Sequence, residues 1–438
     1  MSRIFIGNFD FEHSLGTMPG RALTKAVRQV NAELASVWIA IAREGDIIET
    51  PEPPDEQFAD DLIRQGFPPV RFVGPSSSSD RHHATPLEVC PWGWTESILK
   101  RARQNGWINT APDISAVRVV NSRRFSAQLE REWSVGLPGA VTIDSIDALE
   151  TTIGSVARDK DCWVLKAEFG MSGRERLLGR GWQLPEQTVH WARRRLASNE
   201  RLFFEPWVDC IEEAGLQFSI PPDGSPVLEG ITPLETSPTG QYRGNRFDAA
   251  TSVRETWRDT VEIGRRVARR VQQAGYFGPL GVDAMRYRDA GGAVRLRPIQ
   301  DVNARWTMGA VSLGFRRLLS PGECGFQLHV RPSAVGSVCS LREWYRQRER
   351  TIPEGLRLIR TSPFTVGGRP VKMLTLILIG QPQDFSAAER WSAEFLGLCG
   401  RREGEKRSDS RGDFGMLCVP RDQMAASDRP GDVEFKHL

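Results

Sequence analysis

Short apolar runs and amphipathic segments alternate along the first hundred residues of this chain. RIFIGNF (residues 3–9) and SVWIAIA (residues 36–42) are apolar runs that predict buried strands. Between them, apolar residues recur at helical spacing, at Leu23, Val27, Val30 and Leu34. This order predicts a β-α-β unit. The elements predicted next are a helix at 56–66, a strand at 70–74 and a helix from Thr95 to Gly106.

The same alternation continues from about residue 117. Helices are predicted at 122–133, 144–157, 186–197 and 257–271. Strands are predicted at 162–167, 201–208, 281–287 and 294–303, and the turn DAGG at 289–292 joins the last two as a hairpin. Residues 209–245 form an extended polar stretch. After residue 310 the pattern predicts strands at 356–360 and 371–380, and a charged, glycine-rich mobile tail from 401.

Length and composition describe a globular protein of two or three domains, with 438 residues, 39% of them apolar and 26% charged. The 58 basic and 55 acidic residues leave a net charge of +3, which excludes the strong fields that attract nucleic acid or an anionic membrane. No apolar run is long enough to cross a bilayer. Seven scattered cysteines indicate reduced thiols, so we expect a cytoplasmic protein.

A glycine-rich turn follows a strand that ends in a lysine. Lys166 leads directly into a turn that contains Gly170, Ser172, Gly173, Arg174 and Arg176. Glycines let backbone N–H groups approach phosphate oxygens, and a lysine adds a point charge. The segment is neither a Walker A motif nor a dinucleotide-binding G-x-G-x-x-G. It predicts either a phosphate-binding loop or a plain turn between two strands.

Acidic, amide and guanidinium side chains gather on the hairpin predicted near residue 290. Asp301, Asn303 and Arg305 occupy alternate positions, so they share one face of an extended segment. Asp283 lies on the partner strand. Oxygen ligands without sulfur or imidazole select Mg²⁺ or Mn²⁺, so Asp283, Asp301 and Asn303 are candidate metal ligands. The alternative is that Asp283 only ends a strand.

The order of these motifs resembles the ATP-grasp superfamily over residues 117–310. The motifs are a strand lysine, a glycine loop, a Glu-x-x-Val segment (205–208), an acid on one strand and acid-x-Asn-x-Arg on the next. The resemblance implies a mixed α/β and α+β fold with three parts. These are an N-terminal pre-ATP-grasp-like β-α-β domain at 1–112, a two-lobed ATP-grasp region at 113–310 and a C-terminal extension at 311–438.

The resemblance also implies roles for individual residues. Lys166 would bind the α- and β-phosphates of ATP, and the loop of Gly170, Ser172, Gly173 and Arg174 would close over the β- and γ-phosphates. Arg124, or its neighbour Arg123, would be the first nucleotide-binding cation. Adenine would meet Glu205, Trp207 and Val208. Asp283, Asp301 and Asn303 would hold one or two Mg²⁺ ions, and Arg305 would stabilise charge on the reacting carboxylate.

Several positions depart from the family pattern. Arginine replaces the first lysine, Asp301 replaces the more usual glutamate, and Glu168 places a negative charge beside the phosphate loop. A shorter carboxylate still ligates Mg²⁺ when one more water fills the gap. The ribose-binding acid stays open among Asp209, Glu212 and Glu213, because Gln217 stands where an acid is expected.

The leading hypothesis is an ATP- and Mg-dependent carboxylate–amine ligase that acts through an acyl phosphate. Its partners would be a small-molecule or peptide carboxylate and an amine, with no nucleic acid and no membrane. The alternatives are a kinase that phosphorylates a small molecule and a non-catalytic ATP-binding regulator. PTGQYRGN at 238–245 is either a substrate loop, through Tyr242 and Arg243, or a structural loop. The region after residue 310 would bind a peptide or pair two subunits as a homodimer.

Overall fold

The computed structural model describes residues 1–16, 24–75, 86–156, 161–170, 175–237, 240–248, 251–331 and 338–396. These residues form two compact units. Unit 1 draws its described residues from 1–136, 168–170 and 208–396, and unit 2 draws them from 137–167 and 175–207. The tail predicted from residue 401 lies outside the described residues. The predicted division at 112 and 310 stays a prediction.

A parallel sheet begins unit 1. Its strand order is β3-β2-β1-β4, with β1 at Arg3–Ile6, β2 at Ile47–Glu49, β3 at Arg71–Val73 and β4 at Glu88–Pro91. Its helices include α1 (Phe11–Gly16), α2 (Lys25–Leu34), α3 (Phe58–Arg64) and α4 (Glu96–Gln104). Thr95 caps α4, since its side chain accepts a hydrogen bond from the backbone N–H of Ile98. This confirms an N-terminal α/β region.

The prediction of a strand at SVWIAIA is wrong. Residues Ala35–Ala40 form a 3₁₀ helix, η1, in which all six residues are buried. The second strand of the β-α-β unit is β2, which pairs in parallel with β1. A short apolar run that is buried on every side has no polar face, so its periodicity does not separate a strand from a helix. The predicted β-α-β unit is present, but its second strand lies later in the chain than predicted.

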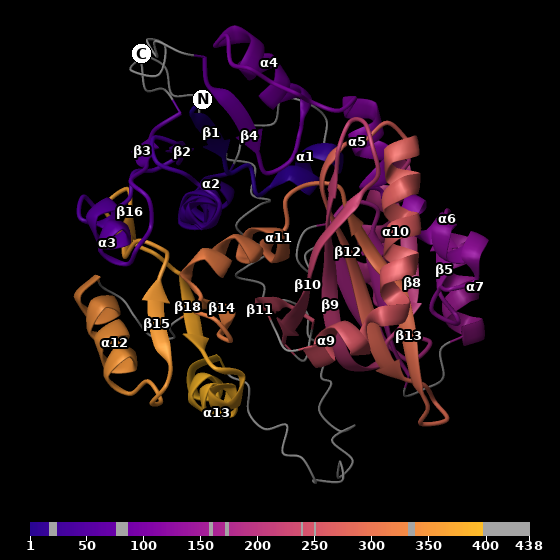
Figure 1. The fold of residues 1–438 in the computed structure, drawn as a ribbon. Coiled ribbons are helices and arrows are strands. Elements are labelled where there is room, and N and C mark those ends of the chain that lie inside the picture. Colours follow the sequence, from indigo (N-terminus) through magenta and orange to yellow (C-terminus); the bar gives the residue numbers. More distant parts are fainter. Residues whose placement is uncertain are drawn as a thin grey trace, which may run out of the picture. The chain divides into compact units, whose positions relative to one another are not determined.

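An eight-stranded antiparallel sheet forms the centre of unit 1 (Figure 1). Its order is β13-β12-β9-β10-β11-β14-β18-β15. The bounds are β9 Asp209–Ile220, β10 Val227–Thr236, β11 Tyr242–Phe247, β12 Gly278–Arg288, β13 Val294–Asn303, β14 Cys324–Val330, β15 Arg357–Arg360 and β18 Leu374–Gly380. The extended polar stretch of the sequence therefore supplies three of the sheet's strands.

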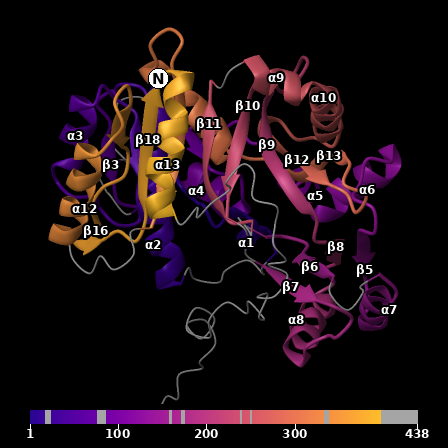
Figure 2. The same ribbon diagram turned by 90° about the horizontal axis from the view of Figure 1, so that it is seen from below.

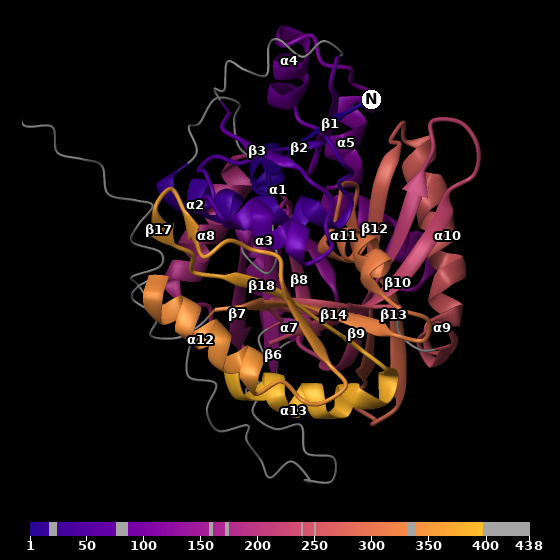
Figure 3. The same cartoon turned by 60° about the vertical axis from the view of Figure 1, so that its left-hand side comes forward.

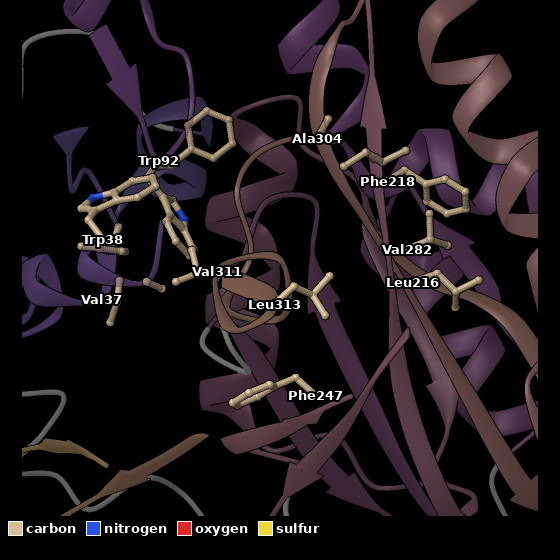
Figure 4. Packing of buried hydrophobic residues seen from close by; sticks show 14 of the residues in the cluster. Val37, Trp38, Trp92, Leu216, Phe218, Phe247, Val282, Ala304, Val311 and Leu313 are labelled. Atoms are coloured by element: carbon tan, nitrogen blue, oxygen red, sulfur yellow. The ribbon is translucent and has the colours of Figure 1, made fainter. Parts of the chain in front are cut away.

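The two faces of this sheet carry different helices. Helix α10 (Arg258–Gln273) lies on one face, where a Cβ on Gly264 would come within 3.0 Å of the Leu216 side chain. Leu216 and Val282 lie close together on neighbouring strands (Figure 4). On the other face, α11 (Met308–Leu313) approaches β9, because a Cβ on Gly309 would meet Gln217. Asp283 follows Val282 along β12, so its side chain points away from α10.

Further helices complete unit 1. Helices α12 (Val338–Arg350) and α13 (Phe385–Leu396) share a hydrophobic cluster with Leu374, Leu376 and Leu378 of β18 (Figures 2 and 3). The remaining elements are α5 (Ile114–Val120), α6 (Arg123–Trp133), α9 (Thr251–Thr256), η3 (Gly314–Leu318), η4 (Pro382–Asp384) and the pair β16 (Thr365–Val366) and β17 (Arg369–Pro370). Within the described ranges, no helix has the length and apolarity to span a bilayer.

Unit 2 is a smaller α+β layer. Its antiparallel sheet has the order β5-β8-β6-β7, with β5 at Val141–Ile143, β6 at Cys162–Ala167, β7 at Arg176–Arg180 and β8 at Leu202–Pro206. Trp163, Leu165 and Phe204 are buried in its core with residues of α7 (Ile146–Val156) and α8 (Glu186–Ala197). The bounds of α8 match the predicted helix at 186–197.

A buried ion pair between α6 and β13 yields a stability prediction. Arg297 donates from Nε to Glu130 Oε1 at 2.7 Å and from Nη2 to Oε2 at 3.1 Å, and both side chains are almost fully buried. We expect Glu130→Ala to lower the free energy of unfolding by about 3–5 kcal/mol, because it leaves a buried guanidinium uncompensated. Urea denaturation measures this change.

Glu132→Ala is the matched control. Glu132 lies on the same helix and pairs with Arg270 at 2.7 Å, but both side chains are exposed. Solvent screens exposed pairs, so this variant should unfold near the wild-type midpoint. Equal destabilisation by the two variants would contradict the role given to burial.

Candidate active site

Two carboxylates face each other across the β12–β13 hairpin. Asp283 and Asp301 are directly opposed in the antiparallel register, so their side chains share one face of the sheet. Asn303 donates from Nδ2 to Asp283 Oδ2 at 3.0 Å. The structure thus brings the three predicted metal ligands together on the sheet face that points away from α10.

The electrostatics of this pair are unfavourable without a cation. Burial, and after it the negative charge of Asp301, raise the pKa of Asp283 from 3.8 to about 7. The charge of Arg305 and the hydrogen bond from Asn303 act in the opposite direction. The raised pKa of Asp283 shows that two negative charges here are unfavourable. A hard divalent cation bound by both carboxylates would remove the repulsion between them.

The candidate metal site has few protein ligands. Within the described part of the chain, no group of three or more His, Cys, Asp or Glu residues is arranged to hold a metal. The set therefore consists of two carboxylates and the Asn303 amide. Asn303 Oδ1 accepts a hydrogen bond from Arg305 Nη2 at 3.0 Å, so ligation through this oxygen requires that bond to be exchanged. Water would complete the shell of an ion as small as Mg²⁺.

Two arginines lie beside the acids. Arg123 donates from Nη1 to Asp301 Oδ2 at 2.9 Å. Arg305 bonds to Glu12, donates to the Trp306 carbonyl at 2.7 Å, and lies over the Trp92 ring at 5.5 Å. Glu12 is a site residue that the sequence interpretation missed. It lies 293 positions before Arg305, and no local pattern connects the two.

Glu168 is accounted for by its contacts. Its carboxylate accepts hydrogen bonds from Ser122 Oγ at 2.6 Å and from Arg124 Nη2 at 2.8 Å. Its backbone oxygen accepts from the Arg123 N–H at 3.2 Å. Glu168 therefore holds the N-terminus of α6, where a negative charge is favourable. Arg124 and Arg123 are the two candidates for the first nucleotide-binding cation. Arg123 bonds to Asp301, one of the candidate metal ligands, and Arg124 pairs with Glu168.

Unit 2 carries the lysine and the glutamate of the predicted nucleotide site. Lys166 Nζ lies 2.7 Å from Glu205 Oε2, and both side chains are only about a tenth exposed, at 12% and 11%. They lie on neighbouring strands, because β6 pairs with β8. Arg176 is directly opposite Lys166 on β7. The ion pair fixes the position of the lysine ammonium group, and the role of Lys166 towards phosphate stays a prediction.

The remaining predicted nucleotide residues are described in part. Gly170 of the glycine loop lies within the described residues, while Ser172, Gly173 and Arg174 lie outside them. Trp207 donates its backbone N–H to the Cys162 carbonyl at 2.8 Å. The chain passes from unit 2 to unit 1 between Trp207 and Val208, within the Glu-x-x-Val segment at 205–208.

The candidates for the ribose-binding acid differ in their surroundings. Glu213 accepts hydrogen bonds from Thr236 and Gln300, each at 2.8 Å, and its charge contributes to the raised pKa of Asp283. Gln217 is buried, donates to Thr232 Oγ1 at 3.0 Å and accepts from Thr307 Oγ1 at 2.6 Å. It holds α11 against the sheet. Asp209 and Glu212 pair with arginines of β12.

No protein-family model and no curated protein matches the sequence. The fold matches solved structures at low identity. N5-carboxyaminoimidazole synthetase from Staphylococcus aureus, complexed with ADP, shares 8% identity at a TM-score of 0.51, covering 90% of this chain and 97% of that chain. The biotin carboxylase–β-γ-ATP complex from Campylobacter jejuni shares 11% at a TM-score of 0.53, covering 83% and 89%.

A further match is the biotin carboxylase domain dimer of 2-oxoglutarate carboxylase from Hydrogenobacter thermophilus, in complex with MgADP, ADP and bicarbonate. It shares 10% identity at a TM-score of 0.50, covering 83% of this chain and 88% of that chain. The chain has the ATP-grasp fold. At such identities the ATP-grasp likeness concerns the fold, and the roles of Lys166, Arg305 and the acids stay predictions.

The raised pKa of Asp283 gives a stability prediction for the metal-free protein. A carboxyl whose folded pKa is above its usual 3.8 stabilises at low pH, and this contribution is lost as pH rises towards about 7. We expect Asp283→Asn to raise the free energy of unfolding at pH 8 by about 2 kcal/mol, since partial exposure screens part of the full shift. Urea denaturation in EDTA, at pH 5 and pH 8, measures the difference.

Asp289→Asn, in the turn of the same hairpin, provides the control. The hydrogen bond from Arg295 and those from the Ala293 and Gly291 N–H groups lower the pKa of Asp289. A carboxyl group with a lowered pKa in the folded protein stabilises the fold above about pH 4. Asp289→Asn should therefore lower the free energy of unfolding at pH 8, opposite to Asp283→Asn. If Asp283→Asn also destabilises at pH 8, the repulsion assigned to the acids is wrong.

Proposed function

We propose that the protein is an ATP- and Mg-dependent ligase that activates a carboxylate as an acyl phosphate for attack by an amine, forming an amide or peptide bond. The observation that carries the proposal is the opposed pair Asp283 and Asp301, flanked by Arg123 and Arg305, on an ATP-grasp fold. The solved structures that share this fold and contain ADP or MgADP support the choice of nucleotide and metal.

In this proposal the residues predicted from the sequence take the following roles in nucleotide binding. Lys166 binds the α- and β-phosphates, and Gly170, Ser172, Gly173 and Arg174 cover the β- and γ-phosphates. Glu205, Trp207 and Val208 bind adenine. Arg124 is the further nucleotide-binding cation, and Asp283, Asp301 and Asn303 hold Mg²⁺. When bound, Mg²⁺ would neutralise the charge of the triphosphate and orient its γ-phosphoryl group.

The residues around the acids suit phosphoryl transfer better than covalent catalysis. The γ-phosphoryl group would pass to a carboxylate oxygen of the substrate as ADP leaves. The amine nitrogen would then attack the acyl carbon, and phosphate would leave with the bonding electrons while the amine loses a proton. Such a path needs cations that are fixed in position. Arg123 and Arg305 are fixed by Asp301 and Glu12.

A trapping assay tests the reaction class. Purified protein with Mg-ATP, pools of small acids and amino acids, and hydroxylamine in place of the amine should release ADP and form a hydroxamate of the activated acid. Asp301→Asn should do neither, because it loses a metal ligand and the partner of Arg123. ADP release with a stable phosphoester would show a kinase, and no ADP release with any acid would refute the ligase.

Arg305→Ala tests the proposed role of that guanidinium. We expect a loss in kcat of roughly 100-fold, or about 3 kcal/mol of transition-state stabilisation, as for loss of an oxyanion donor. Arg295→Ala is the control, since Arg295 lies on β13 with its side chain largely exposed and pairs with Asp289 at 2.7 Å. Wild-type turnover in Arg305→Ala would exclude the role.

A further inference from the structure

The chain turns where β13 ends, and we call residues 303–306 the Arg305 turn. β13 ends at Asn303, and the Arg305 N–H donates to the Asn303 carbonyl at 2.9 Å. Both backbone groups of Ala304 bond to the Asn121 side chain. The Ala304 N–H donates to Asn121 Oδ1 at 2.9 Å, and Asn121 Nδ2 donates to the Ala304 carbonyl at 3.3 Å. The Asn121 amide therefore binds Ala304 in the way that a residue of a neighbouring strand would.

Two of the groups that accept hydrogen bonds from the Arg305 guanidinium belong to the turn itself. Arg305 Nη1 donates to the Trp306 carbonyl at 2.7 Å, and Nη2 donates to Asn303 Oδ1 at 3.0 Å. Glu12 accepts from outside the turn, and the Trp92 carbonyl accepts from the Trp306 N–H at 3.0 Å. Acceptors within the turn fix the guanidinium only while the turn keeps its shape. The direction of Arg305 therefore depends on how the turn is held, and Asn121 holds its centre.

Asn121 has a fixed position at the junction of α5 and α6. It is the C-terminal cap of α5, it is 9% exposed, and its Nδ2 also donates to the Val117 carbonyl at 2.8 Å. Its amide oxygen faces an N–H group and its amide nitrogen faces two carbonyls, so these groups are matched. Two residues later, Arg123 bonds to Asp301 at 2.9 Å. The junction thus bonds both to β13 and to the residue that follows β13.

Capping of α5 does not account for the bonds to Ala304. The bond to the Val117 carbonyl already serves the helix end, whereas Ala304 lies 183 positions away from Asn121. Asn105 shows the simpler case. It caps α4, and its Nδ2 donates to the Arg101 carbonyl at 2.9 Å. Asn105 makes no further side-chain hydrogen bond to the residues that the structure describes, so it is a cap and nothing more.

We propose that Asn121 is a positioning residue of the ligase: by holding both backbone groups of Ala304, it sets the direction in which Arg305 presents its guanidinium to the reacting carboxylate. The inference rests on the proposed ligase function and adds a residue that touches neither substrate nor nucleotide. Arg305 carries the charge, and Asn121 acts through it. A cation that stabilises charge in the transition state must be fixed before the reaction, because small misplacements lower the rate.

Chemical modification of arginines tests the positioning without any turnover. Full-length protein in EDTA is treated with phenylglyoxal, which reacts with guanidinium groups, and the modified peptides are followed by mass spectrometry. The Arg305 side chain is 11% exposed in its bonded position. We expect Asn121→Leu to raise the rate of Arg305 modification by about tenfold, because a loosened turn releases the guanidinium from its partners. An unchanged rate overturns the proposal.

Two controls separate positioning from general loosening. Asn105→Leu removes the same type of capping bond from α4 and should leave the rate of Arg305 modification at the wild-type value. Arg297 lies on β13 in a buried ion pair and should react at its wild-type rate in Asn121→Leu. Equal acceleration at Arg297 and Arg305 would show a structural role alone and overturn the proposal. If Asn121→Leu does not fold, Asn121→Ser replaces it with the same expected result, since its shorter side chain leaves room for water beside the turn.

Turnover in the hydroxamate assay gives a second test. We expect Asn121→Leu to lower kcat about tenfold while the KM for ATP stays within about twofold, because the residues assigned to the nucleotide are unchanged. A residue that acts through Arg305 loses its effect once that guanidinium is absent. Asn121→Leu should therefore cause no further loss of kcat when it is combined with Arg305→Ala. Additive losses in the double variant contradict the positioning role.

The two measurements separate this inference from the ligase proposal. Arg305 modification that depends on Asn121, with no ADP release or hydroxamate from the wild-type protein, would reject the ligase and leave the hold of Asn121 on Arg305 standing. Hydroxamate formation at an equal kcat in the wild type and in Asn121→Leu would leave the ligase standing and reject the positioning role.

Discussion

The repulsion between Asp283 and Asp301 is the constraint around which the site is organised. The antiparallel register places the two carboxylates directly opposite each other on one face, and no lysine or arginine lies between them in the described hydrogen bonds. Arg123 engages Asp301 from one side, and Asn303 connects Asp283 to Arg305. A fold that retains such a pair loses stability at neutral pH, which is typical of a site selected for binding.

Each cation assigned to the site that lies among the described residues already has an acidic partner. Lys166 pairs with Glu205, Arg124 with Glu168, Arg123 with Asp301 and Arg305 with Glu12. These pairs hold the side chains in position before any anion arrives. An entering phosphate or carboxylate must therefore compete with an internal carboxylate, which lowers affinity but fixes geometry.

The sequence predicted the chemistry of the hairpin better than the sheet around it. Asp301, Asn303 and Arg305 occupy alternate positions, and alternate residues of a strand share one face. The turn at 289–292 identifies the strand that pairs with theirs, so the grouping of the acids and the fold could be predicted. Strands β9 to β11 were missed because polar residues lie on the site face and interrupt their apolar pattern. Glu12 and Glu168 act through contacts made by distant segments, and no local pattern marks such contacts.

The assignment of the segment around Glu168 limits how the chain can be divided. Residues 168–170 belong to unit 1, although the strands before and after the glycine loop belong to unit 2. Deleting 137–207 to isolate unit 1 would therefore also delete the carboxylate that anchors Ser122 and Arg124 at the start of α6. A single deletion of 137–207 therefore does not leave unit 1 intact, and a shortened chain that keeps α6 in place must supply an acid there by another route.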